Sequence, residues 1–439
     1  MSIIKNKLFC LIVIALLARA SAGFFHLKRG VPDTEGYFRT AEQLISGDYT
    51  GYIGKRPPVY PLIIAAAGFN PEVIIWIQGI MGVGISVLLY LLFSTLTGKG
   101  TLGFLIGLSY AVNPSQIMCE NFLVSETTCT FILTLSVYLF FKMTIRRVSS
   151  TWYELILFGL VCSLCVLTRA QYQFLPIIYA IFLGYHLKAG IGESVWKTAV
   201  FLIPVVILVG AWGLFQYKRI GQFTIAPELG YSLTNHTINF IEFAPDRYDN
   251  IKQVLIRNRQ NKLQAKGETY VAYVTAVPEL LELTKLSYAQ LSQKLVEINL
   301  AAIKEKPLLY LKGVATGCIR FFKPFWPGRL YGIRPAISKG GILLKSIAAA
   351  YTFFQITLML IFLIFPFLLM FSTSFRKEFV QSLEITFIYS LALGTGFLQA
   401  LVELGENARY KTSVEPLMIC MAIWAAFELI RRPSQSGKR

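Results

Sequence analysis

Long uninterrupted apolar runs are the feature that most constrains how this chain folds. A helix needs about 20 apolar residues to cross roughly 30 Å of hydrocarbon, where every backbone polar group must be satisfied internally. Hydrophobic residues make up 55% of the 439 and charged residues only 15%, too few to cover a water-soluble protein of this size. The sequence therefore predicts an all-α polytopic membrane protein, with ten apolar stretches at 8 to 25, 71 to 95, 101 to 118, 121 to 143, 153 to 168, 171 to 187, 196 to 216, 342 to 371, 379 to 402 and 412 to 430.

The short loops predict the orientation of these stretches, because cytoplasmic loops carry an excess of Lys and Arg. If the stretches alternate in direction, both termini and the basic short loops lie in the cytoplasm: Lys5, Lys7, Lys99, Lys142, Arg146, Arg147, Lys188, Lys197, Arg376, Lys377, Arg431, Arg432, Lys438 and Arg439. Residues 26 to 70, 113 to 120 and 217 to 341 then face outside. We expect the active site there, on the external face of the inner (plasma) membrane of a bacterium.

Three parts follow from this count. An N-terminal membrane module, 1–216, carries the first external loop, 26–70; a basic helical extracytoplasmic subdomain spans 217–341; a C-terminal membrane module spans 342–439. Residues 307–325 are apolar but interrupted by basic residues, so we expect them to lie along the membrane surface. The first apolar stretch is expected to be a signal anchor, although its Ala-x-Ala end also fits a cleaved signal peptide.

The composition leaves few classes of cofactor or partner. The net charge of +18 would suggest nucleic acid for a soluble protein, but here it indicates anionic lipid, so the bilayer and not nucleic acid is the expected partner. Seven cysteines and three histidines supply no zinc or haem motif. The sequence identifies no definite cofactor and leaves a divalent cation open, because Asp33 and Glu120 would suit magnesium or manganese if they met.

The first external loop carries the most informative polar residues. Asp33 lies soon after the first apolar stretch, where a carboxylate can deprotonate a hydroxyl or simply begin a helix in water. A short amphipathic helix is predicted to end at Gly47. Arg56 precedes two prolines, so a stiff segment displays its guanidinium, which suits a phosphate; Lys55 adds a second charge. Contact with lipid headgroups is the alternative for both cations.

Further polar residues fall where other stretches reach the same side. Glu126 lies about 9 Å of helix rise beyond Glu120, which would place it within a span, where an ionisable group is functional by default or pairs two helices. Arg169 ends the fifth stretch. Glu406 and Arg409 are three residues apart and form either a donor site or a surface pair.

The order of these motifs resembles the GT-C membrane glycosyltransferases, in particular the protein O-mannosyltransferase and aminoarabinose transferase relatives. The matching pieces are Asp33-x-x-x-Tyr37, Arg56-Pro57-Pro58-x-Tyr60-Pro61-Leu62, Asn113-Pro114-Ser115 with Glu120 and Ser125-Glu126-Thr127, Leu167-Thr168-Arg169, and Glu406-Asn407-Ala408-Arg409-Tyr410 followed by Glu415-Pro416. Ala170 replaces the usual proline, and one residue is inserted between Glu406 and Arg409. The resemblance runs from residue 33 to 416, but 217–341 contributes little.

The resemblance implies a GT-C-like helical bundle that moves a sugar, with inversion, from a polyprenyl-phosphate carrier to a lipid, glycan or protein acceptor. Asp33 would be the catalytic base and Arg56, Lys55, Arg169 and Arg409 would hold the donor phosphate across a gap as wide as one monosaccharide. Supporting or substrate-binding roles would fall to Glu35, Tyr37, Tyr60, Glu120, Glu126, Glu406 and Tyr410. The alternatives are a lipid or glycolipid flippase and a non-catalytic GT-C-like assembly factor.

Overall fold

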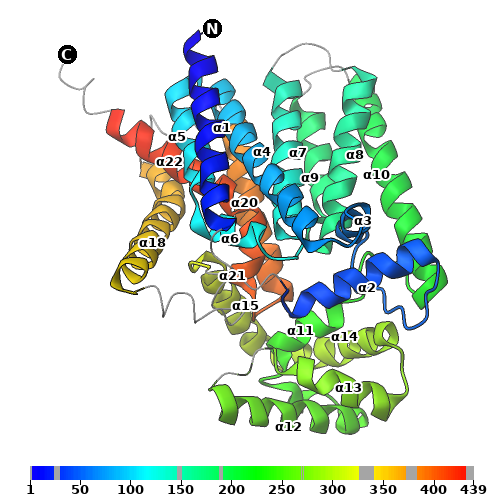
Figure 1. Ribbon diagram of the computed structural model, residues 1–439. Helices are drawn as coiled ribbons and strands as arrows, with labels where there is room; N and C mark the ends of the chain where they lie inside the picture. Colours follow the sequence, from blue (N-terminus) through cyan, green and yellow to red (C-terminus); the bar gives the residue numbers. More distant parts are fainter. Residues whose placement is uncertain are drawn as a thin grey trace.

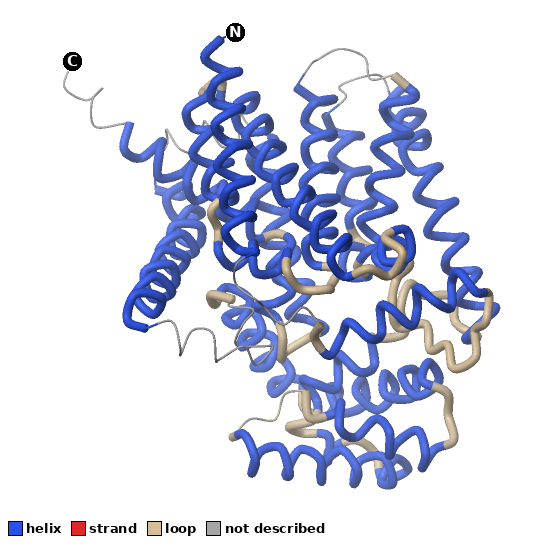
Figure 2. The backbone as a smooth tube through the Cα atoms, in the orientation of Figure 1, coloured by secondary structure: helices blue, strands red, loops and turns tan. Residues whose placement is uncertain are grey.

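A computed structural model describes residues 2–23, 30–145, 151–186, 191–267, 269, 271–325, 341–371 and 383–431. Within these ranges the backbone forms helices, turns and loops, and no strand (Figure 2). The all-α prediction is therefore confirmed for this part of the chain. The end of the predicted 217–341 subdomain, from 326 to 340, lies outside the described residues.

The helices form a bundle with a smaller helical unit at one end (Figure 1). The bundle contains α1 (Ser2–Gly23), α4 (Pro71–Thr97), α5 (Gly100–Ala111), α7 (Glu126–Ile145), α8 (Trp152–Thr168), α9 (Leu175–His186), α10 (Ile191–Ile220), α18 (Gly341–Phe371), α20 (Leu383–Val402) and α22 (Glu415–Arg431). The smaller unit contains α11 (Leu229–Thr237), α12 (Asp249–Lys266), α13 (Tyr273–Thr284) and α14 (Tyr288–Glu305). Short helices lie between the two: α2 (Pro32–Ser46), α3 (Val59–Ala66), α6 (Pro114–Glu120), α15 (Pro307–Phe322) and α21 (Asn407–Tyr410). The start of α1 and the end of α22 lie at the end of the bundle opposite α12 (Figure 1).

Four of the described helices are long and apolar enough to cross a membrane: α4, and the Glu126–Thr144, Gly192–Ile220 and Glu384–Val402 parts of α7, α10 and α20. Shorter apolar helices cover Gly100–Ala111, Trp152–Thr168, Ala170–Gly184 and Ala349–Phe365. Large apolar side chains point outward, such as Trp76 at 71% exposure and Val206 at 69%. Water-soluble proteins rarely expose such a surface, so the fold is consistent with a helical membrane protein. The ten spans and their orientation remain predictions.

The third and fourth apolar stretches, 101 to 118 and 121 to 143, are not continuous helices. Pro114 opens α6, and the Asn113 side chain caps its first backbone N–H groups. After Glu120 the chain turns, and Gln78 of α4 donates to two of the carbonyls freed by the turn. Helix resumes only at Glu126. The continuous helix assumed from Glu120 to Glu126 is therefore wrong. Glu126 is instead the first residue of α7 and of the apolar segment Glu126–Thr144 that is long enough to cross a membrane.

Residues 30 to 70, predicted to form the first external loop, have their own small core. Gly47, at φ +72°, ends α2, as the sequence predicts, but α2 begins at Pro32 and so includes Asp33 in its first turn. Tyr37 and Tyr60 pack edge to face at 4.9 Å. The same core contains Ala41, Ile64, Phe122, Leu123 and Val124, which joins the loop to the turn before α7.

The unit of α11 to α14 has a separate core, which includes Tyr231, Leu255, Leu280, Leu291 and Ile298. The helices of this unit agree with the helical character predicted for residues 217 to 341, in the part of that segment that the structure describes. From this unit α15 returns the chain to the bundle, where Tyr310 donates to the carbonyl of Leu401 and Arg320 to that of Leu404. Its placement along the membrane surface remains a prediction.

Close approach of α8 and α10 depends on a glycine. A Cβ at Gly159 would lie 2.2 Å from the carbonyl oxygen of Phe201. We expect Gly159→Ala to cost about 1–3 kcal/mol by forcing these helices apart. Gly210→Ala on α10, where a Cβ meets nothing within 4 Å, is the matched control and should not destabilise. Thermal unfolding in detergent measures both; equal midpoints would contradict the close-packing argument.

Candidate functional site

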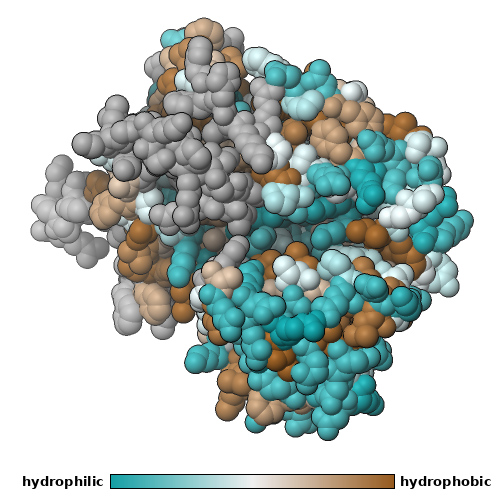
Figure 3. Space-filling model, turned by 60° about the horizontal axis from the view of Figure 1, so that its bottom comes forward, coloured by the Kyte–Doolittle hydropathy of each residue, from teal (hydrophilic) through white to brown (hydrophobic). Residues whose placement is uncertain are grey.

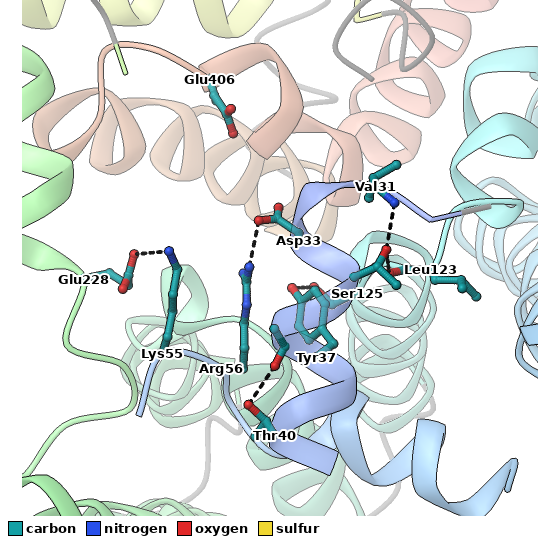
Figure 4. A network of polar contacts seen from close by, with 12 residues as sticks. Val31, Asp33, Tyr37, Thr40, Lys55, Arg56, Leu123, Ser125, Glu228 and Glu406 are labelled. Carbon is teal, nitrogen blue, oxygen red and sulfur yellow. Dashed lines mark hydrogen bonds and ion pairs between the residues drawn. The ribbon is translucent and has the colours of Figure 1, made fainter. Parts of the chain in front are cut away.

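Asp33 lies between two guanidinium groups. Its Oδ1 accepts a hydrogen bond from Arg56 Nη2 at 2.7 Å (Figure 4). Its Oδ2 accepts one from Arg409 Nη2 at 2.6 Å. Arg56 comes from the loop between α2 and α3, whereas Arg409 comes from α21, 376 residues from Asp33. The fold therefore brings together the predicted base and two of its four predicted cations.

Arg409 is the centre of this cluster. Besides Asp33, its Nε donates to Glu126 Oε1 at 2.6 Å and its Nη1 to Glu406 Oε2 at 3.1 Å. Arg169 Nη1 lies 3.2 Å from the same oxygen of Glu126. The loop that carries Arg409 is itself fixed, because Asn407 donates to a carbonyl of α15. The pair of Glu406 and Arg409 thus belongs to a network and not to the open surface.

Two of the three arginines, Arg56 and Arg169, each lie against a tyrosine ring. The Arg56 guanidinium lies 4.4 Å from the ring centre of Tyr37, and that of Arg169 lies 5.3 Å from the ring centre of Tyr410. The Tyr37 hydroxyl bonds to Ser125 at 2.8 Å, one residue before Glu126. These contacts orient the guanidiniums by cation–π attraction and leave their edges for hydrogen bonding. We refer to Asp33, Arg56, Glu126, Arg169, Glu406 and Arg409 as the arginine–carboxylate cluster.

The charges of the cluster balance, with three guanidiniums against three carboxylates. Burial raises the pKa of Asp33, but the guanidiniums of Arg409 and Arg56 outweigh burial and hold this pKa well below its ordinary value of 3.8. The carboxylates of Asp33 and Glu406 stay about one quarter exposed, at 26% and 27%, whereas the side chain of Arg409 is 10% exposed. The expected gap as wide as a monosaccharide between Asp33 and its cations is wrong, because the groups are in direct contact.

Hydrogen-bonding capacity is left over inside the cluster. Arg56 Nε, Arg169 Nη1 and Glu126 Oε2 are buried and make no hydrogen bond within the described chain; Arg169 Nη1 is near Glu126 but not aligned with it. A buried donor without an acceptor costs about 1–3 kcal/mol. Two such donors on cations favour the binding of an oxyanion.

Other predicted residues lie outside the cluster. Glu35 is exposed, because it is two residues from Asp33 on the same helix and so faces the opposite way. Tyr60 is buried and donates to Gln78, which makes it a structural neighbour of the site. Lys55 faces Glu228 at 3.8 Å and not Asp33.

Glu120 belongs to a second buried ion pair. Arg19 Nη2 lies 2.7 Å from Glu120 Oε1, and burial raises the pKa of Glu120 to about 7 in spite of Arg19. The structure therefore does not assemble Asp33 and Glu120 into one metal site. Across the described ranges, no group of three or more His, Cys, Asp or Glu side chains is placed to hold a metal ion.

Sequence reasoning missed two polar contacts near the site. Arg19 interrupts the first apolar stretch, and an arginine on such a helix needs a buried anion, which is the sequence signal for its pair with Glu120. Glu403 accepts hydrogen bonds from Asn235 of α11 and from the Gly405 backbone, both at 2.6 Å. This contact ties the smaller unit to the loop that carries Arg409; the sequence gives no signal for it.

No protein-family model matches this chain, and no curated protein matches it significantly. The geometry of the site is therefore the basis on which a function can be proposed.

Removing the negative charge of Glu126 should lower the stability of the folded protein. We expect Glu126→Gln to destabilise the protein by about 3–5 kcal/mol, because Arg169 and Arg409 lose the charge that compensates their burial. The control is Glu35→Gln, an exposed carboxylate on α2, which should change stability by less than about 0.5 kcal/mol. Similar unfolding midpoints for the two variants would contradict this account.

The pH dependence of stability should report the pairing of Asp33. Because the pKa of Asp33 in the folded chain lies below 3.8, the ionised carboxylate stabilises the fold above that pH, and this contribution is lost as the pH falls below it. We expect the difference in unfolding midpoint between wild type and Asp33→Asn to shrink between about pH 5 and pH 3. A difference that does not vary with pH would show that the pairs contribute nothing to stability.

Proposed function

We propose that this protein is a membrane glycosyltransferase that uses a polyprenyl-phosphate sugar as donor, with its active site at the arginine–carboxylate cluster. The observation that carries the proposal is a partly exposed carboxylate, Asp33, held between two arginines within a group of buried guanidiniums whose donors are not all used. This arrangement supports the proposal because it puts an acid–base group beside cations that suit an oxyanion, and transfer from a phosphate leaving group requires both.

The proposed reaction is an in-line displacement. The acceptor oxygen forms a bond to the anomeric carbon, the bond from that carbon to the phosphate oxygen breaks, and the acceptor proton passes to Asp33. The products are the glycosylated acceptor and a polyprenyl phosphate that has gained one negative charge. Arg56, Arg169 and Arg409 would stabilise this charge as it develops, which lowers the barrier more than binding the donor alone.

Donor binding would also prepare the base. In the resting site Arg56 and Arg409 occupy both oxygens of Asp33 and make it a poor proton acceptor. A phosphate that takes over these guanidiniums would release Asp33 and raise its pKa. Once Asp33 is protonated, the formerly neutral cluster carries one positive charge in excess, at the moment when the leaving phosphate becomes more negative. The direct contacts seen here are therefore compatible with catalysis.

The external site, the acceptor and the orientation are parts of this proposal. Helices α2 and α21, which carry Asp33 and Arg409, lie at the end of the bundle that carries the α11–α14 unit, away from the start of α1 (Figure 1). If the basic short loops are cytoplasmic, this end is external, where a lipid-linked donor is available and cytosolic nucleotide sugars are not.

The test is mass spectrometry of surface glycans, lipids and proteins from cells with and without this chain. A sugar missing without the chain should return with wild type and not with Asp33→Asn, because losing a positioned base lowers the rate by about 10²–10⁴-fold. Asp48→Asn is the matched control: Asp48 lies in the same loop, but its carboxylate is exposed and bonds only locally to Thr50 among described contacts.

Equal transfer by Asp33→Asn and wild type would refute the role of Asp33 as base. A flippase would give a different pattern, since transport of a glycolipid does not need proton removal from an acceptor, so the same variant would then restore the missing sugar.

A further inference from the structure

Lys55 and Glu228 lie next to the arginine–carboxylate cluster but not within it. Lys55 Nζ is 3.8 Å from Glu228 Oε2, at the outer limit of an ion pair, and the two side chains are 37% and 31% exposed. Figure 4 shows Lys55 and Arg56 extending side by side toward the level of the Asp33 carboxylate, with Glu228 facing the tip of Lys55. Both charged groups therefore remain accessible close to the proposed base.

A tyrosine pair fixes Glu228 in place. Tyr288, the first residue of α14, donates to Glu228 Oε1 at 2.7 Å. Tyr231 of α11 stacks on Tyr288 with ring centres 4.5 Å apart and donates to its carbonyl. Tyr231 is buried, so the Tyr288 ring rests on the core of the α11–α14 unit. Lys55 Nζ lies 5.7 Å from the ring centre of the same tyrosine, Tyr288.

The chemistry of these three groups suits hydroxyl groups better than an anion. A carboxylate accepts hydrogen bonds, an ammonium donates them, and a tyrosine ring offers an apolar face with a polar edge. A phosphate here would meet the negative charge of Glu228 only a few ångströms from Lys55. Figure 3 shows a hollow with mainly hydrophilic residues around it, between the α11–α14 end and the rest of the molecule.

We propose that Lys55, Glu228 and Tyr288 bind the hydroxyl groups of the transferred sugar. This inference rests on the proposed glycosyl transfer. Lys55 directly precedes Arg56, and a sugar attached to a phosphate held by Arg56 would extend no more than a few ångströms from it. Lys55 thus moves from the predicted phosphate site to a sugar site, and the α11–α14 unit supplies two of the three groups that select the sugar.

The test compares lipids with and without the sugar. Purified full-length protein in nanodiscs is titrated with decaprenyl phosphate and with decaprenyl phosphates that carry mannose, glucose or arabinose. Wild type should bind at least one sugar-bearing lipid tighter than decaprenyl phosphate. Glu228→Gln and Tyr288→Phe should each reduce this preference by about tenfold or more, as expected for lost hydrogen bonds to a charged group, and leave binding of decaprenyl phosphate unchanged.

Glu279→Gln is the matched control, since Glu279 lies on the same unit and pairs with Arg257 at the surface; its preference should equal that of wild type. An unchanged preference in Glu228→Gln and Tyr288→Phe would overturn the subsite, and so would a wild type that binds all four lipids equally. Failure of wild type to bind decaprenyl phosphate would instead overturn the proposed function.

Discussion

The site depends on the guanidinium of Arg409, which forms ion pairs with Asp33, Glu126 and Glu406 at the same time. These groups come from α2, from the start of α7 and from α21, so one side chain joins segments far apart in the sequence. A buried guanidinium is tolerated only with compensating anions, and each anion here needs the cation equally. The cluster can therefore form only when the loop, the bundle and the C-terminal segment are all in place.

The same pairing sets the reactivity of Asp33. A carboxylate bonded to two guanidiniums stabilises the folded site, but its lowered pKa makes it a poor base. Contacts that stabilise the site without substrate therefore reduce the basicity of Asp33. An oxyanion that competes for the arginines resolves this conflict. When the oxyanion binds to the guanidiniums, it replaces the Asp33 carboxylate there and leaves that carboxylate free to accept a proton. Unused donors on Arg56 and Arg169 show that the cations can bond to more than their present partners. A neutral cluster also explains how so many charges lie close to an apolar bundle.

Much of the fold is readable from the sequence. Most described residues of the ten apolar stretches lie on helices, Gly47 ends α2, and Asp33, Arg56, Arg169 and Arg409 lie in one network. Other expectations failed for local reasons. Pro114 and the turn after Glu120 interrupt helices that hydrophobicity alone would continue, and Lys55 turns to Glu228, which belongs to a segment that carries no recognisable motif. Hydropathy reports burial in lipid or core, but it does not report which polar group faces which.

The sequence by itself determined the helical class, the positions of the apolar helices and the small set of polar residues worth examining, because hydrophobic burial and helix signals act over a few neighbouring residues. Only the tertiary structure decided that Asp33 touches Arg56 and Arg409 directly, that Glu120 pairs with Arg19, and that the α11–α14 unit contributes Glu228 and Tyr288 beside the cluster. Partner choice among buried charges depends on distances between segments hundreds of residues apart, and those distances are fixed only when the helices pack.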